Sequence, residues 1–226
     1  MKRNAGLVIA IDGVVGSGKT STAREVARVL GYRHLDTGAM YRAATLAARQ
    51  AGVAAAETAA LADLLSRIRI TLLPQHQGGA VLLDGRDVSH RIRSPEITRA
   101  VGAYADLPLV RRALIAQQQR LGAEGGVVAE GRDIASVVFP DADLKIRMVA
   151  DLRARALRRF RELTEKGVSI SLEDVVTDIR QRDAEDAARD YGTCAPPTDV
   201  IELDTTGMTL NGQVEHIVSL ARQRGA

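Results

Sequence analysis

The segment from residue 7 to residue 30 constrains the fold of this chain more than any other. The apolar run Leu7-Val8-Ile9-Ala10-Ile11 leads through Asp12 into Gly13-Val14-Val15-Gly16-Ser17-Gly18-Lys19-Thr20, and a helix-like stretch follows from Ser21. This is the pattern G-x-x-x-x-G-K-[ST] between a strand and a helix, which is typical of a phosphate-binding loop. The glycines let the backbone turn tightly, so that successive N–H groups and the helix N-terminus face negative charge.

The loop predicts a nucleotide site with assigned roles. Lys19 is expected to reach the β- and γ-phosphates, and Thr20 to offer its hydroxyl to Mg²⁺. The alternative is a glycine-rich turn with a surface lysine, which the strand-loop-helix context disfavours. The predicted nucleotide-binding residues are Gly13, Val14, Val15, Gly16, Ser17, Gly18, Lys19, Thr20 and Ser21.

Strand and helix patterns alternate along the chain. Short apolar runs typical of buried strands lie at 7–12, 33–35, 127–130, 144–149 and 200–203. Helical patterns lie at 19–30, 39–51, 108–121, 152–165, 171–187 and 210–223. This alternation predicts an α/β fold with a mostly parallel sheet covered by helices. Residues 67–73 and 80–83, with a turn at Gln77-Gly78-Gly79 and a further turn before Val88, predict a small antiparallel hairpin or meander.

Composition is compatible with an enzyme of a reducing compartment. The chain has 226 residues, a net charge of +3 and one cysteine, Cys194, so that it can form no internal disulfide. Its apolar N-terminal run is too short for a signal peptide or a membrane span. We therefore expect a cytoplasmic protein with no membrane partner.

Two further strand ends carry candidate phosphate ligands. Thr37 opens a helix that carries Arg42 one turn later, and both could hold a second phosphate. A helix cap at Asp36 or Thr37 followed by a surface arginine explains the same spacing equally well. Behind another strand, Arg132 suits a phosphate and Asp133 a hydrogen-bond donor on a base, unless the two form an ion pair with each other.

A dense arginine cluster follows the strand at 144–149. Its members are Arg153, Arg155, Arg158, Arg159 and Arg161. Arg155, Arg158 and Arg159 share a helix face, with Glu162 and Glu165 as partners if that face is merely solvated. Beyond Gly167 a second helix carries Arg182, Asp183, Asp186 and Arg189. Two arginine-bearing helices joined through a glycine predict a lid that closes over phosphates.

Taken together, the motifs resemble those of the bacterial cytidylate kinases, from Ile9 to the final helix. The resemblance rests on Ile11-Asp12-Gly13 with the phosphate-binding loop, Leu35-Asp36-Thr37-Gly38-Ala39-Met40-Tyr41-Arg42, Asp87-Val88-Ser89 with Ile92-Arg93, Pro108-Leu109-Val110-Arg111, Glu130-Gly131-Arg132-Asp133, Val137-Val138-Phe139-Pro140-Asp141-Ala142, and Arg182-Asp183 with Asp186 and Arg189. It implies transfer of the γ-phosphoryl group of ATP to CMP or dCMP with Mg²⁺, by a monomer that needs no nucleic acid. It also implies a core (about 1–59, 106–152 and 190–226), an acceptor-binding insertion (about 60–105) and a lid (about 153–189).

The resemblance also implies roles for single residues. Thr37, Arg42 and Arg132 would hold the acceptor phosphate, Arg111 and Asp133 the cytosine, and Asp186 and Arg189 the sugar hydroxyls. Lys19, Arg132, Arg158 and Arg182 would stabilise the phosphoryl group in transfer. Asp36 and Tyr41 complete the acceptor set, Asp36 as a residue that orients groups near the metal.

Some positions depart from the family pattern. A serine near the cytosine is usual where this chain has Gly102, and Gly-Thr is the commoner pair where it has Ala135-Ser136. A glycine side chain donates no hydrogen bond, so that selectivity for cytosine over uracil is left open.

Other functions remain open from the residues alone. A kinase of UMP or shikimate would keep the loop and the arginines. Asp204-Thr205-Thr206-Gly207 matches the D-x-x-G of GTPases, but the chain has no N-K-x-D. A nucleic-acid-binding module is disfavoured, because two phenylalanines, four tyrosines and no tryptophan leave little for base stacking.

Overall fold

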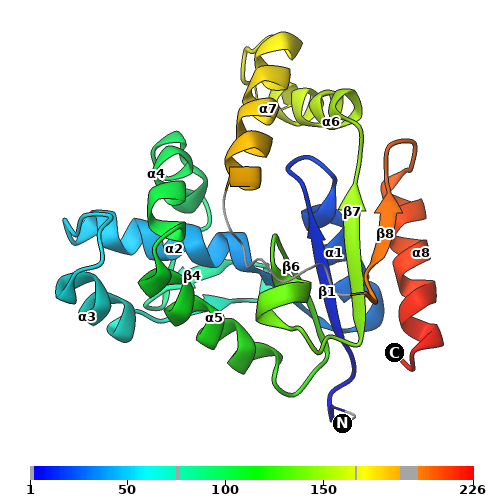
Figure 1. Cartoon of the computed structure of the whole chain (residues 1–226), viewed down its shortest axis with the longest axis horizontal. Helices are drawn as coiled ribbons and strands as arrows, with labels where there is room; N and C mark the ends of the chain where they lie inside the picture. The colour runs from blue at the N-terminus through cyan, green and yellow to red at the C-terminus, as the bar shows by residue number, and fades with distance from the viewer. Residues whose placement is uncertain (1–2, 75–76, 166, 189–197) are drawn as a thin grey trace. The chain divides into compact units, whose positions relative to one another are not determined.

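The chain folds into two compact units. The computed structural model describes residues 3–74, 77–165, 167–188 and 198–226 (Figure 1). The first unit comprises the chain up to Tyr32 together with Gly125–Ala226, and the second comprises Arg33–Glu124. The predicted sugar ligand Arg189 and the single cysteine, Cys194, lie outside the described residues.

The first unit is built on parallel strands in the order β6-β1-β7-β8. Its strands are β1 (Val8–Gly13), β6 (Val127–Gly131), β7 (Leu144–Val149) and β8 (Ile201–Asp204). Ile9 lies between Val128 and Leu144 in this register, and Asp12 pairs with Gly131. Parallel strands need crossover connections, which helices usually supply. The parallel order of these strands therefore confirms the predicted alternation of strands and helices.

Helices α1 (Lys19–Leu30) and α8 (Leu210–Gln223) pack together and share one apolar core with these strands. Figure 1 shows α8 alongside β8. The helices contribute small and β-branched side chains, such as Ala23, Val26 and Ile217, against Ile11 and Ile146. Close packing of this kind fixes where β1 ends, and therefore where the phosphate-binding loop begins.

Helices α6 (Leu152–Glu165) and α7 (Leu172–Ala188) pack on each other in the same unit. Their small core consists of Ala156, Val175 and Ile179, with Val15 of the phosphate-binding loop packed against it. Both predicted helices of the arginine-rich region are confirmed. None of the helices within the described ranges is long and apolar enough to cross a membrane.

The second unit combines helices with a small antiparallel sheet. Its elements are β2 (Arg33–Asp36), α2 (Thr37–Gln50), α3 (Ala59–Arg67), β3 (Ile70–Leu72), β4 (Val81–Leu83), β5 (Arg86–Asp87), the 3₁₀ helix η2 (Arg91–Arg93), α4 (Pro95–Ala105) and α5 (Pro108–Gly122). Strands β3, β4 and β5 form an antiparallel meander, as predicted for residues 68–90.

Two parts of the second unit were not predicted. Residue 67 was assigned to a strand but ends α3, a helix that the Thr58 side chain caps by accepting from the Leu61 N–H at 3.2 Å. Helix α4 was also absent from the predicted helices, although Ser94 caps it and Pro95 occupies its first turn. The predicted α/β fold class, with parallel strands, helices and a small antiparallel sheet, is confirmed, whereas the predicted core, insertion and lid boundaries stay predictions.

Candidate active site

The phosphate-binding loop runs from Gly13 at the end of β1 to the start of α1. Gly16 and Gly18 have φ of +76° and +92°, which strains any residue with a Cβ. At Gly13 a Cβ would collide with the main-chain oxygen of Met148 on the neighbouring strand. Glycine is therefore required for the turn and for its close approach to β7.

The carbonyl groups of this loop are held by donors outside the turn. Arg132 Nη1 donates to Gly13 O at 2.8 Å and Arg155 Nη1 donates to Val15 O at 3.2 Å. Lys19 Nζ lies 3.3 Å from Val14 O. A peptide C=O and the next N–H point in opposite directions, so that each of these bonds also fixes the orientation of the N–H group that follows. Successive N–H groups in fixed orientations are what an anion-binding nest requires.

Lys19, predicted to reach the β- and γ-phosphates, is buried at the start of α1. Its side chain is buried, and this burial, with the charge of Arg132 in addition, lowers the pKa of Lys19 to about 8. Glu130, Asp12 and Asp186 oppose the shift. The ammonium form is still favoured at neutral pH, and phosphate charge would favour it further.

Thr20, the predicted metal ligand, donates its hydroxyl to Glu130 Oε2 at 2.7 Å. Glu130 is buried at the end of β6, one strand from the loop. Sequence reasoning included Glu130 in a motif but assigned it no role. A carboxylate directly behind the apolar run Val127-Val128-Ala129 was the signal, because strand ends on one edge of a parallel sheet lie close together.

Asp12 anchors the turn that carries Arg132 and Asp133. Its two carboxylate oxygens accept from the N–H groups of Ile134 at 2.8 Å and Ala135 at 2.9 Å. Burial raises the pKa of Asp12 to about 6, although these two N–H groups oppose the rise. Asp12 thus joins the end of β1 to the π-helical turn η3 (Ile134–Val138), a link that sequence spacing did not reveal.

Arg132 and Asp186 form an ion pair at 2.7 Å between Arg132 Nε and Asp186 Oδ2. The predicted phosphate ligand and the predicted sugar ligand are therefore brought together, although they are 54 positions apart. Asp133 itself is buried.

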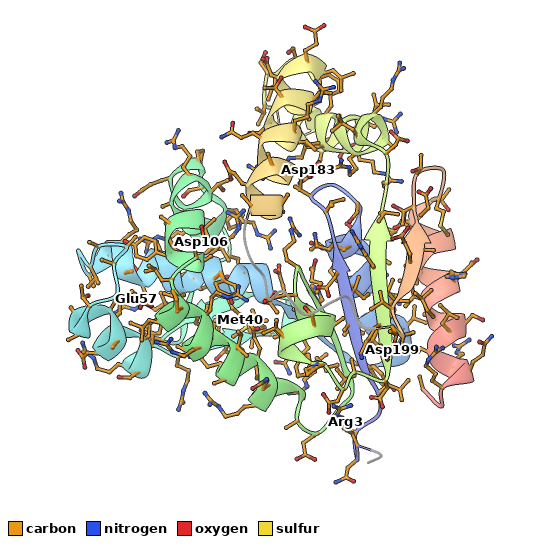
Figure 2. All side chains as sticks on the ribbon, in the orientation of Figure 1. Arg3, Met40, Glu57, Asp106, Asp183 and Asp199 are labelled. Atoms are coloured by element: carbon orange, nitrogen blue, oxygen red, sulfur yellow. The ribbon has the colours of Figure 1, made fainter. Side chains whose placement is uncertain are left out.

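Arg155 is the buried member of the arginine cluster. Its guanidinium donates to Ala150 O at 3.0 Å and to Val15 O at 3.2 Å, and its Nη2 pairs with Asp183 Oδ2 at 2.8 Å. Figure 2 labels Asp183 on α7. Arg155 thus connects the phosphate-binding loop to α6 and α7, a structural role that was not assigned from sequence.

Two predicted lid arginines also lie in this unit. Arg158 Nη1 is 3.4 Å from Ser17 O and its Nη2 contacts Thr205 O, so that it already touches the phosphate-binding loop. Arg182 lies on α7 with Asp178 at 3.5 Å. Arg159 pairs with Glu162 at 2.8 Å, which is the solvated-face arrangement that the sequence left open.

The start of α2 carries the predicted acceptor residues of the second unit. Asp36 caps the helix, accepting from the Ala39 N–H at 2.8 Å, and its other oxygen lies 3.9 Å from Arg93 Nη2. The cap reading of this segment is therefore correct for Asp36. Thr37 is buried at the first helical position, and Tyr41 is half-buried one turn later.

Arg42 is held in place from α4. Its Nη1 donates to Thr98 Oγ1 at 2.8 Å and lies 3.3 Å from Ile92 O. Gly102 lies one turn beyond Thr98 on the same helix, and the predicted base ligand Arg111 is half-buried on α5. Arg42 is thus a fixed guanidinium rather than a free surface arginine, and Thr98 is a residue that sequence reasoning missed.

This chain is similar to known proteins over nearly its whole length. The cytidylate kinase family model matches residues 9–223. A cytidylate kinase of Streptococcus thermophilus is 42% identical over 216 residues, which cover 95% of this chain and 96% of the relative. That of Pelodictyon phaeoclathratiforme is 44% identical over 234 residues, with 99% and 100% covered. A solved structure of an uncharacterized protein from Eubacterium ventriosum has a TM-score of 0.51 at 11% identity over 96% of this chain and 98% of the other, a likeness of fold alone.

Proposed function

The chain belongs to the cytidylate kinase family, and from this premise we propose that it transfers the γ-phosphoryl group of ATP to CMP or dCMP, giving ADP and CDP or dCDP. One observation in the structure supports the proposal most directly. Three basic side chains, Arg132, Lys19 and Arg155, converge on the phosphate-binding loop and donate to its carbonyl groups, which supports binding of a polyphosphate there. The UMP, shikimate and GTPase alternatives are not favoured by the family match.

The reaction needs no covalent nucleophile from the protein. An oxygen of the acceptor phosphate attacks the γ-phosphorus in line, and the bond to the β-phosphate oxygen breaks. Catalysis therefore depends on positioning two polyanions and neutralising their repulsion. Lys19 and the loop amides are assigned to the donor phosphates, and Arg132, Arg158 and Arg182 to the phosphoryl group in transfer.

Two of these arginines must exchange partners when nucleotides bind. Arg132 is paired with Asp186, and Arg158 contacts the main chain of Thr205 and Thr206. Phosphate oxygens are competing acceptors for the same guanidinium groups. Binding of both nucleotides would thus release Asp186 for the sugar hydroxyls and draw α6 and α7 toward the phosphates.

The acceptor residues are assigned from the resemblance to the family. We assign Thr37 and Arg42, with Arg132, to the acceptor phosphate, and Arg111 and Asp133 to the cytosine. Asp36 and Tyr41 complete the set, and Arg189 would share the sugar hydroxyls with Asp186. Support from the structure is the burial of Thr37 and Asp133 and the fixed position of Arg42.

Mg²⁺ fits the donor side. This ion prefers oxygen ligands and usually takes one or two carboxylates together with substrate phosphates. Thr20 would supply a hydroxyl oxygen as the ligand, and the buried Glu130, which accepts from this hydroxyl at 2.7 Å, would orient it and add a negative charge nearby. When bound, the ion neutralises charge that develops between the β- and γ-phosphates. We further infer a cytoplasmic monomer that acts on small nucleotides without nucleic acid.

The test is a coupled assay of ADP formation with ATP, Mg²⁺ and each of CMP, dCMP and UMP. The proposal predicts turnover with CMP and dCMP and a lower kcat/KM for UMP. Turnover of UMP alone would contradict the acceptor assignment, and absence of turnover with every monophosphate would contradict the reaction.

The cytosine contact of Asp133 has its own test. Asp133→Asn should raise the KM for CMP about tenfold, because the amide can present a donor to the exocyclic amino group. The KM for ATP should stay within about twofold of the parent value. Equal losses for both nucleotides would mean that buried Asp133 acts only in folding the turn.

A further inference from the structure

The turn after β8 touches the phosphate-binding loop but has no part in the reaction as proposed. It contains Asp204, Thr205 and Thr206, from the tetrapeptide that resembles a GTPase motif. Thr205 is completely buried, and its Oγ1 lies 3.0 Å from Ser17 O and 3.1 Å from Val149 O. A buried hydroxyl from the far end of the chain therefore reaches a main-chain carbonyl of the nucleotide site.

The single hydroxyl proton of Thr205 has two candidate acceptors, and their needs differ. Val149 O already accepts from the Thr205 N–H at 2.8 Å. Ser17 O has Arg158 Nη1 at 3.4 Å as its other donor, a long contact. The hydroxyl proton therefore stabilises the fold more in a bond to Ser17 O than in one to Val149 O, because a buried carbonyl without a donor is costly.

The role of Thr205 grows once nucleotides bind. The proposed function moves Arg158 from Ser17 O and Thr205 O to the transferring phosphate. Thr205 Oγ1 is then the donor, among the described residues, that holds the Ser17 carbonyl. Since the Gly18 N–H belongs to the same peptide as Ser17 O and points the opposite way, this contact aims the Gly18 amide toward the phosphates.

The turn itself is held rigidly. Asp204 Oδ1 accepts from the N–H of Thr206 at 2.9 Å and from its hydroxyl at 2.6 Å. Thr206 Oγ1 in turn accepts from the Asp151 N–H at 3.0 Å, and Asp151 caps α6 by accepting from Ala154 N at 2.7 Å. Thr205 is thus carried on a turn that is tied to the first lid helix.

We propose that Thr205 is a positioning residue for the donor nucleotide, which fixes the Ser17–Gly18 peptide of the phosphate-binding loop through its hydroxyl. The inference rests on the proposed function in one respect, namely that the loop binds ATP. It predicts that loss of the hydroxyl weakens ATP binding and leaves acceptor binding in place.

Three variants separate the hydroxyl from packing. Thr205→Val keeps the shape and removes the hydroxyl, Thr205→Ser keeps the hydroxyl, and Thr177→Val removes an exposed hydroxyl on α7 that donates to Glu173 O at 3.0 Å and has no part in the proposal. Calorimetric ATP titration should give a Kd about tenfold higher for Thr205→Val, or about 1.4 kcal/mol, and a Kd within about twofold of the parent for the other two. The KM for ATP should follow the Kd, while the KM for CMP stays within about twofold.

Several outcomes would overturn the proposal. The proposal is wrong if Thr205→Val binds ATP as tightly as the parent, or if Thr205→Ser binds ATP as weakly as Thr205→Val. It is also wrong if Thr205→Val loses affinity for ATP and CMP equally and has a lower urea midpoint. The failure of the proposed function has a different signature: the unmodified protein itself would then fail to bind ATP or to phosphorylate CMP.

Discussion

The two units of this protein prepare for phosphate by different means. In the first unit the proposed ligand is the main chain, and side chains such as Arg132 and Arg155 hold its carbonyls. In the second unit the proposed ligands are side chains, with Arg42 held by Thr98 and Thr37 buried at a helix start. A main-chain nest has little freedom to lose on binding, whereas a side-chain site depends on one or two fixed rotamers.

The first unit also contains a group of charged residues around its phosphate-binding loop. The first unit holds Lys19, Asp12, Glu130, Arg132 and Asp186 close enough to shift the pKa of Lys19. We expect donor binding to depend on pH through Lys19.

The largest expected effect is at Lys19. Lys19→Ala should lower kcat by about 10²–10³-fold, because it removes the charge that follows the γ-phosphate in the transition state. The urea midpoint serves as a check on folding. Turnover close to that of the parent would remove the main support for a donor site in the first unit.

Two arginines of α2 test whether acceptor binding can be weakened without a change in donor binding. Arg42→Ala should raise the KM for CMP by about 10- to 100-fold, as expected for a lost hydrogen bond to a charged group, with little change in the KM for ATP. Arg49 is the matched control on α2, since it forms an exposed pair with Glu96 at 2.8 Å. If Arg49→Ala raises the KM for CMP as much as Arg42→Ala does, the assignment of Arg42 is wrong.

The pH dependence distinguishes the two substrates. The pKa of Lys19 is about 8 in the free protein, so that its charge is present below this pH and is lost above it. The kcat/KM for ATP should be level below pH 8 and fall about tenfold for each further unit. With ATP saturating, phosphate charge raises the pKa of Lys19, and the kcat/KM for CMP should fall only at higher pH.

Lys19→Arg is the control for this profile. The guanidinium stays charged throughout this range. The kcat/KM for ATP of Lys19→Arg should therefore be lower than that of the parent but should not change across pH 8. A decline at pH 8 that persists in Lys19→Arg would assign the titration to another group.

The smallest expected effect is at Gly102 on α4. Gly102→Ser restores the hydroxyl that the family usually has there, and should raise the kcat/KM for CMP over UMP about two- to threefold. Serine also suits a helix better than glycine by about 0.5 kcal/mol, which a urea titration would measure. An unchanged ratio of CMP to UMP would show that this position does not contact the base.

Much of the fold could be predicted because its patterns are local. The strands that became β1, β6, β7 and β8, and helices such as α1 and α8, follow from apolar runs, caps and glycines close in sequence. Helices α3 and α4 were missed because each is short and buries few residues, such as Leu61 and Leu65 or Ile97 and Tyr104. A weak apolar face over three turns is hard to tell from a strand or a loop.

By itself, the sequence determined the phosphate-binding loop, the order of strands and helices, and the identities of the candidate phosphate ligands, since motif spacing and backbone preferences act over a few residues. Only the tertiary structure decided what each ligand contacts: Glu130 with Thr20, Arg132 with Asp186, Arg42 with Thr98, and Thr205 with Ser17. These partners are 54 to 188 positions apart. They meet because sheet register and helix packing bring distant segments together, and no local pattern in the chain encodes which side chain will be there.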